Sequence, residues 1–148
     1  MANDNRELGW EDEILNTPAG PEVPDGEYDF IVDHFERQKV GDNSKKYAGM
    51  NMAVVYCNIQ TDGEPQLKTN MIMHTNFQWK LSQFFISIGQ MENEENATLR
   101  MNWKTVGGSR GRCRVKNLPN YNDKEKTHPE ITDFLPPVAN GKKWGNNF

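Results

Sequence analysis

A chain of 148 residues with a formal net charge of −4 is long enough for one ordinary domain and its core. Only 35% of its residues are hydrophobic, and no apolar run approaches the roughly 18 to 20 residues of a membrane-spanning helix. The N-terminus is polar and acidic without an apolar signal region, so we expect a cytosolic protein. Cys57 and Cys113 are far apart in sequence, which favours reduced, half-buried strand residues over a disulfide or a zinc site.

The charges are segregated along the chain. Residues 1–27 hold eight acidic residues and one arginine, a net charge of −7, whereas residues 100–126 hold eight basic and two acidic residues, a net charge of +6. An acidic chain therefore contains a basic segment. Such a segment either contacts an anionic partner such as a nucleic acid or forms a solvated face.

The first half of the chain predicts an acidic arm followed by three strands. The arm covers residues 1–25. From Gly26 the side chains of Tyr28, Phe30 and Val32 alternate with mostly charged residues, as in a half-buried strand. Two further strands are predicted over residues 52–60 and 66–75, and the Asp-Gly pair between them is typical of a hairpin turn.

The segment after the third strand changes to helical spacing. Asn76 can cap the start of this helix, and Gly89 lies near its end. Apolar side chains recur at intervals of three and four residues: Phe77, Leu81, Phe84, Phe85, Ile88 and Met91. We expect Phe84, Phe85 and Ile88 to plug a barrel formed by the strands, whereas Trp79 lies off this stripe and either packs or stays exposed.

A basic strand follows the helix. Cations occupy alternate positions, which places all four on one strand face about 7 Å apart: Arg110, Arg112, Arg114 and Lys116. This ladder suits a nucleic-acid backbone. The alternative interpretation is an exposed edge strand that charge protects from aggregation.

The order strand, strand, strand, helix, strand, strand predicts a mainly β fold. We expect a five-stranded barrel like the oligonucleotide-binding (OB) fold over residues 26–135, with one helix between strands 3 and 4. A strand at residues 130–135 closes it, and residues 136–148 form a flexible tail. In such a barrel the first and fourth loops flank the binding groove. Here these loops, residues 38–49 and 117–128, are both basic and both contain a tyrosine.

The predicted function is binding of single-stranded nucleic acid, largely without sequence preference and without catalysis. Cations neutralise phosphates, and bases stack on Tyr47 and Tyr121. Tyr56 and Trp103 either stack bases as well or belong to the core. The complete candidate set is Arg37, Lys39, Lys45, Lys46, Tyr47, Lys68, Arg110, Arg112, Arg114, Lys116, Tyr121 and Lys124.

Four segments resemble a family of small phage proteins encoded beside replication and recombination genes. They are LGWEDEI at residues 8–14, GEY at 26–28, WKLSQFFISIGQ at 79–90 and GSRGRCRV at 108–115. The resemblance extends to about Phe134, and the helix is its most specific part. It implies a phage single-stranded-DNA-binding protein that acts in replication or recombination in the cytoplasm of the infected bacterium. The acidic segment of this chain is N-terminal, whereas the well-known bacterial single-stranded-DNA-binding proteins have an acidic C-terminal tail.

Other functions remain as alternatives. The acidic arm suits an adaptor or inhibitor that acts on a replication or host-defence protein. An enzyme is disfavoured because His34, His74 and His128 are scattered and no HExxH, P-loop or paired-carboxylate motif is present. We expect no cofactor, no metal and no membrane contact. A barrel of this kind works as a monomer or, through exposed strand edges, as a dimer.

Overall fold

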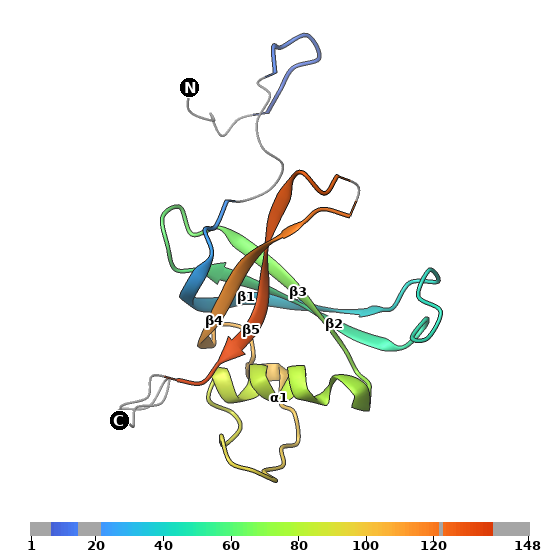
Figure 1. Ribbon diagram of the computed structural model, residues 1–148, viewed down its shortest axis with the longest axis vertical. Coiled ribbons are helices and arrows are strands. Elements are labelled where there is room, and N and C mark those ends of the chain that lie inside the picture. The colour runs from blue at the N-terminus through green and yellow to red at the C-terminus, as the bar shows by residue number, and fades with distance from the viewer. Residues whose placement is uncertain (1–6, 15–21, 122, 138–148) are drawn as a thin grey trace.

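A computed structural model describes residues 7–14, 22–121 and 123–137 of the chain. The elements follow the predicted order (Figure 1): β1 (Gly26–Lys39), β2 (Asn51–Ile59), β3 (Gln66–Ile72), a 3₁₀ turn η1 (Thr75–Phe77), α1 (Gln78–Ser87), a 3₁₀ turn η2 (Trp103–Thr105), β4 (Arg110–Pro119) and β5 (Thr127–Leu135). The prediction of a mainly β fold with five strands and one α-helix is therefore confirmed for this part of the chain.

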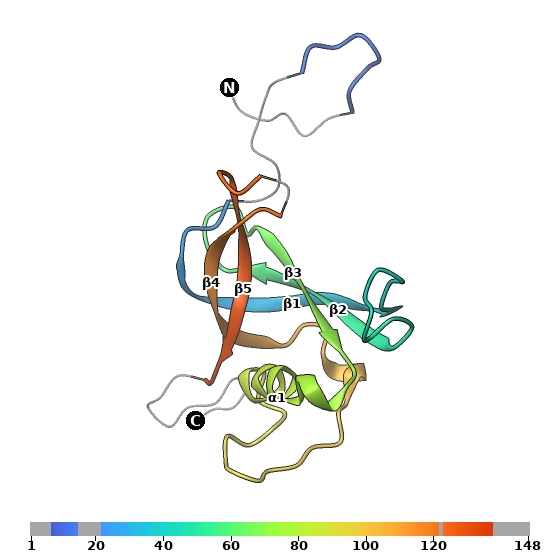
Figure 2. The same cartoon turned by 45° about the vertical axis from the view of Figure 1, so that its right-hand side comes forward.

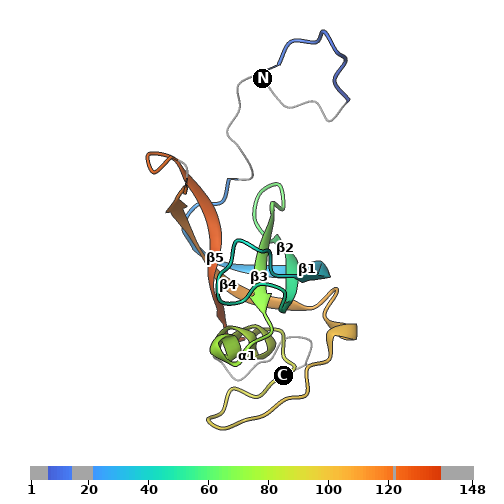
Figure 3. The same ribbon diagram turned by 90° about the vertical axis from the view of Figure 1, so that its right-hand side faces the viewer.

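All five strands belong to one antiparallel sheet in the order β3-β2-β1-β4-β5. The central strand β1 is long enough to serve two partners. Its first half pairs with β4 and its second half with β2, and a register irregularity between Val32 and His34 lies near the change of partner. Such a bulge bends a strand and increases its twist. The sheet consequently coils around itself, as Figures 1 and 3 show.

The two edge strands of this coiled sheet are β3 and β5. Within the described ranges no ladder of backbone hydrogen bonds joins them, so the sheet is not closed into the barrel that we predicted. One physical reason lies in α1. Lys80 Nζ donates a hydrogen bond of 2.9 Å to the main-chain oxygen of Asn70 in β3. The helix thus satisfies part of the edge that a closing strand would use.

The core lies inside the coil of the sheet and is covered at one end by α1 (Figure 2). Phe84, Phe85 and Ile88 are at most 7% exposed, as predicted, whereas Trp79 is exposed. The Phe84 ring packs edge-on against Phe134 of β5, with 5.1 Å between centroids. The helical stripe is therefore a packing surface and not a base-stacking platform. Cys57 and Cys113 are also buried, as free thiols.

The close approach of α1 to β4 requires a glycine at position 111. A Cβ atom there would lie 2.6 Å from Phe30 Cζ and 2.6 Å from Ser87 Oγ. The buried Ser87 hydroxyl accepts a hydrogen bond from the Arg112 amide and donates one to the Arg112 carbonyl, both at 2.9 Å. This contact fixes the helix on the inner face of the strand that carries the cation ladder.

The start of the helix differs from the prediction. Asn76 does not cap it: α1 begins at Gln78, and its N-cap residue, Phe77, makes no side-chain capping bond. The capping side chain belongs to His74, which accepts from the Asn76 amide at the start of η1. The Asn76 side chain instead donates to Tyr47 Oη at 3.1 Å. Gly89 has φ +85° just after the helix, as expected for its end.

The later elements also differ from their predicted bounds. The loop between β4 and β5 is shorter than residues 117–128, because β4 continues to Pro119 and β5 already begins at Thr127. The end of the N-terminal arm is fixed to β4. The Asn117 side chain donates to the carbonyl of Val23 and to the carboxylate of Asp25, each at 2.8 Å, and Val23 is buried. The hydrogen bonds from Asn117 lower the pKa of Asp25.

Candidate nucleic-acid interface

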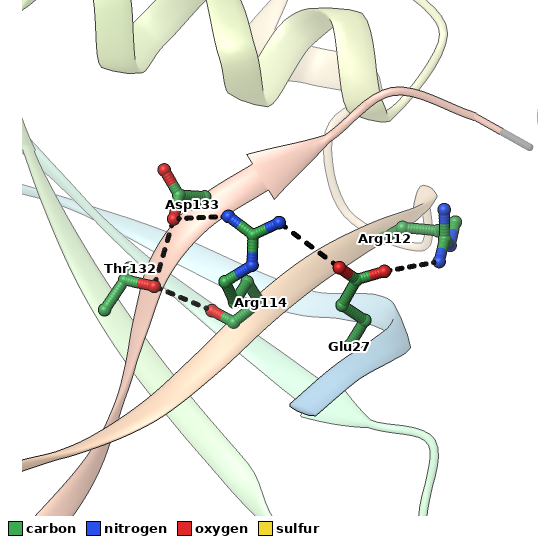
Figure 4. A network of polar contacts seen from close by, with 5 residues as sticks. All are labelled: Glu27, Arg112, Arg114, Thr132 and Asp133. Atoms are coloured by element: carbon green, nitrogen blue, oxygen red, sulfur yellow. Dashed lines mark hydrogen bonds and ion pairs between the residues drawn. The ribbon is translucent and has the colours of Figure 1, made fainter. Parts of the chain in front are cut away.

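The alternating cations of β4 lie on the outer face of the sheet, as their spacing predicted, but two of them are paired with acids. Glu27 Oε1 lies 3.2 Å from Arg112 Nη2, and Glu27 Oε2 lies 3.2 Å from Arg114 Nη2. Arg114 Nη1 is also 3.2 Å from Asp133 Oδ2 (Figure 4). The carboxylate of Glu27 therefore bridges two guanidinium groups, and Arg114 bridges two carboxylates.

Strand register explains this network. Glu27 on β1 and Asp133 on β5 are both direct cross-strand neighbours of Arg114, and Asp29 is the neighbour of Arg112. The hydrogen bond to Glu27 raises the pKa of the Arg114 guanidinium. Because β4 lies between β1 and β5, the interpretation of the ladder as edge protection is wrong. Its two central cations, Arg112 and Arg114, are instead balanced by acidic residues of the neighbouring strands.

A second group of cations lies around the edges β3 and β5 and in the loops. No ion pair of the described residues involves any member of this group, which we name the unpaired lysines: Lys45, Lys46, Lys68 and Lys124. Lys116 also has no ion pair among the described residues, but it lies on β4 opposite Glu130 of β5. Lys45 and Lys46 belong to the loop between β1 and β2, and Lys124 to the loop between β4 and β5. These are the two loops that flank the binding groove of an OB barrel.

The first loop is fixed against the start of the helix by Tyr47. Its ring packs edge-on against His74 at 5.4 Å and against Phe77 at 5.1 Å, and its hydroxyl accepts from Asn76. Lys46 Nζ lies 5.6 Å from the centroid of the same ring. Tyr47 therefore serves as an anchor of the loop. In the fourth loop Tyr121 is 95% exposed, which leaves its ring accessible for stacking.

The outer face of β1, β2 and β3 carries an aromatic pair beside a lysine. The Tyr56 ring stacks on His34 with 4.3 Å between centroids and 12° between planes. Lys68 is the cross-strand neighbour of Tyr56 on β3. Trp103 lies elsewhere, packed against Phe85 at 5.2 Å and against Phe35 at 5.0 Å. The sequence left open whether Tyr56 and Trp103 stack bases or belong to the core. In the structure Tyr56 lies on the outer face, whereas Trp103 packs against the core.

A groove of about 580 Å³ separates the two sheet edges. Polar and aromatic side chains dominate its lining: Tyr56, Lys68, Asn70, Lys80, His128 and Glu130. Burial lowers the pKa of Lys80. His128 Nδ1 lies 2.5 Å from Asn120 Oδ1, and its Nε2 lies 2.5 Å from Glu130 Oε2. The groove therefore joins the base of the fourth loop to the outer face of β3.

Sequence reasoning missed Lys80, His34 and His128 as members of this surface. Lys80 lies on the polar side of α1, where periodicity alone predicts solvent exposure. The sequence alone does not group His34 with Tyr56, because the two residues belong to different strands. The pairing of β1 with β2 is what places these two rings together.

Arg37 and Lys39 lie on the opposite face of the β1–β2 hairpin from Lys68. Arg37 is the cross-strand neighbour of the inward-facing Ala53, and its guanidinium carbon lies 5.7 Å from the Phe35 centroid. Lys39 Nζ donates to Asn51 Oδ1 at 2.7 Å. These two candidates are therefore not brought together with the groove. Arg110 lies at the start of β4, opposite Ile31 of β1.

The described ranges contain no group of three or more His, Cys, Asp or Glu side chains that could hold a metal ion. Among the described residues, no helix has the length and apolar character needed to cross a membrane. Comparison with known proteins found no matching family model and no matching curated protein. The resemblance to a phage family thus stays a prediction from the four sequence segments.

Proposed function

We propose that this protein binds single-stranded DNA without catalysis, through an open form of the OB barrel. The strand order and the position of the helix between β3 and β4 support this proposal. OB folds bind oligonucleotides across the face of strands 2 and 3, between the first and fourth loops. In this chain those positions correspond to Tyr56 on β2, Lys68 on β3 and the two lysine-containing loops, and His34 of the neighbouring β1 stacks on Tyr56.

The observation that carries the proposal is the groove between the two sheet edges, which Lys68 and Lys80 line together with the ring of Tyr56. Single-strand binding without sequence preference combines a positively charged groove with aromatic rings on which bases stack. The Arg112 and Arg114 ladder is less suitable, because a phosphate would have to compete with Glu27 and Asp133. The proposed phosphate contacts are therefore Lys45, Lys46, Lys68 and Lys124, with Lys80 inside the groove.

The biological setting that we propose rests on the phage resemblance. The protein protects or organises single-stranded DNA during replication or recombination in the cytoplasm of the infected bacterium. Its partners are single-stranded DNA and the phage replication or recombination proteins.

Fluorescence anisotropy with a labelled oligo-dT of about 30 nucleotides tests the function directly. We expect binding that weakens steeply with salt, because each phosphate contact releases counterions. A duplex of the same length is the control and should bind much more weakly at every salt concentration. Absence of binding to the single strand at low salt would overturn the proposal.

One observation favours the adaptor alternative as a second candidate. In the arm, Trp10 is fully exposed, and Leu8 and Ile14 are also exposed, among acidic residues. Exposed apolar side chains of this kind are suited to docking on a partner protein. A Trp10→Ser and Ile14→Ser variant should then lose binding to a purified phage recombination protein while keeping its affinity for DNA. Unchanged binding of that protein would reject the alternative.

A further inference from the structure

The outer face beside the groove is not uniformly basic, because β1 contributes carboxylates next to the aromatic pair. Glu36 Oε1 accepts a hydrogen bond from Tyr56 Oη at 3.2 Å and one from Gln38 Nε2 at 2.8 Å. Asp33 Oδ2 lies 2.6 Å from His34 Nδ1. The carboxylates thus lie at the aromatic pair itself, on the β1 side of Tyr56.

Lysines lie on the opposite side of the same ring. Lys68 is the cross-strand neighbour of Tyr56 on β3, and Lys80 lines the groove beyond it. The carboxylate of Glu130 also lines this groove, so Tyr56 separates a side with two lysines and one carboxylate from a side with two carboxylates. A phosphodiester backbone is attracted to the lysines and repelled by the carboxylates. A bound strand would consequently place its phosphates toward β3 and its bases toward Tyr56, His34 and β1.

The carboxylates remain available to a ligand. The side chains of Asp33 and Glu36 are 47% and 48% exposed, and a carboxylate offers about four acceptor positions. Hydrogen bonds from His34 and Asn58 lower the pKa of Asp33, so this group is ionised at neutral pH. A base that stacks at this face would have its edge next to the two carboxylates. Ionised carboxylates accept hydrogen bonds and donate none.

We propose that this face prefers bases with an exocyclic amino group over thymine, with Glu36 and Asp33 as the groups that discriminate. This inference rests on the proposed single-strand binding and narrows it, since binding without sequence preference would treat the two pyrimidines alike. Cytosine presents an amino donor at C4, and carboxylates accept from that group, whereas thymine presents a carbonyl oxygen at the same position. A carboxylate facing that oxygen is repelled by it. Cytosine and thymine have rings of the same size, so stacking on Tyr56 differs little between them.

The test compares labelled oligo-dC and oligo-dT of about 30 nucleotides at pH 7.5 by anisotropy. We expect roughly tenfold tighter binding of oligo-dC, a ratio within the range of one good base contact. The Glu36→Gln variant should lose most of this preference, since the amide lacks the charge and adds a donor. Glu95→Gln is the matched control: it removes the same charge in the loop after α1 and should keep the preference.

The outcomes separate this inference from the proposed function. Salt-sensitive binding of both strands with equal affinity would overturn the base preference and leave the single-strand function standing. Failure to bind either strand would overturn both. Asp33→Asn serves as a second variant if Glu36→Gln does not fold, as judged by its thermal unfolding. A preference for oligo-dC that persists in every folded variant of Glu36 and Asp33 would reject the assignment to these carboxylates.

Discussion

Two cationic regions of this protein differ in the charges that surround them. On β4, Arg112 and Arg114 are held by Glu27 and Asp133 at 3.2 Å. Lys68 at the groove between β3 and β5, and the lysines of the two loops, form no ion pair with any described residue. In the sequence the β4 arginines are the ones without close acidic neighbours, whereas Asp123 and Glu125 flank Lys124. The three-dimensional pairing of strands makes one of them a structural network and leaves the other available for a ligand.

This difference shows that the spacing of charges along one strand determines only the face on which they lie. Whether they are neutralised depends on the strands on each side. Acidic residues of β1 and β5, far away in the sequence, are the direct neighbours of the β4 arginines. A basic strand in the centre of a sheet is therefore a weaker indicator of nucleic-acid binding than cations at sheet edges and in loops.

The largest effect on stability is expected at Gly111, on the inner face of β4. Gly111→Ala places a Cβ atom 2.6 Å from Phe30 and from the Ser87 hydroxyl, so we expect the free energy of unfolding to fall by about 3 kcal/mol. Urea unfolding measures this change. The matched control is Gly107→Ala, where the nearest atom is 3.9 Å away and the effect should be small. Equal stability of the two variants would contradict the close packing of α1 on β4.

The next largest effect is expected at Tyr56, which lines the groove between β3 and β5. Tyr56→Ala removes the ring that stacks on His34, and affinity for oligo-dT should fall about tenfold, as expected for the loss of one base stack. Tyr56→Phe keeps the ring and removes only the hydroxyl that donates to Glu36, so its affinity should stay close to that of the unmodified protein. Anisotropy titrations at one fixed salt concentration compare the three proteins. A loss of equal size in both variants would mean that the ring is not a stacking surface.

A moderate effect is expected from the two buried thiols in alkaline solution. Burial raises the pKa of Cys113 from 9.0 to about 12 and raises the pKa of Cys57 as well. Above pH 9 the unfolded chain therefore releases these protons while the folded protein keeps them. Their contribution to stability is complete below about pH 9 and is lost as the pH rises toward 12.

Urea unfolding between pH 8 and pH 11 tests this dependence. The double variant Cys57→Ala and Cys113→Ala should start with lower stability because of the cavities it creates. Its stability should then decrease less steeply with pH than that of the unmodified protein. Parallel decreases in the two proteins would show that the thiols do not contribute.

The smallest effect is expected for Glu27→Gln, which breaks the bridge between Arg112 and Arg114. These side chains are partly exposed, and solvent-exposed ion pairs contribute little to stability. We therefore expect a slight decrease in Tm by differential scanning fluorimetry and no loss of affinity for DNA. A marked loss of affinity would place the DNA on this network and would remove the distinction between the two cationic regions.

The sequence predicted the elements well where periodicity is strong. The alternation around Phe30 and the stripe of Phe84 and Phe85 identified a strand and a helix, because burial of one face imposes these periods. The sequence did not predict the features that depend on neighbouring strands. The pairing of Arg114 with Glu27, the stack of His34 on Tyr56 and the open edge of β3 all depend on register and sheet curvature.

The same distinction, between features of one segment and features that depend on neighbouring elements, applies to the candidate site residues. Lys45, Lys46 and Lys68 were identified from their position in a basic loop and on an outer strand face, and the fold leaves them without ion pairs among the described residues. Lys80 was missed because only the docking of α1 on the β3 edge brings it to the groove. Strict alternation along β1 predicts Arg37 on the outer face with Asp29 and Asp33, but the bulge after Val32 shifts the alternation by one residue and places Arg37 on the other face.

The most direct test removes the positive charges of the two cationic regions in two separate variants. Salt titrations of oligo-dT binding would compare a Lys45→Gln, Lys46→Gln and Lys68→Gln variant with an Arg112→Gln and Arg114→Gln variant. We predict that the lysine variant loses about three units of the slope of log affinity against log salt, roughly one for each lost phosphate contact. The arginine variant should keep its slope and lose some thermal stability instead. The opposite pattern would contradict the account and would place the DNA on β4.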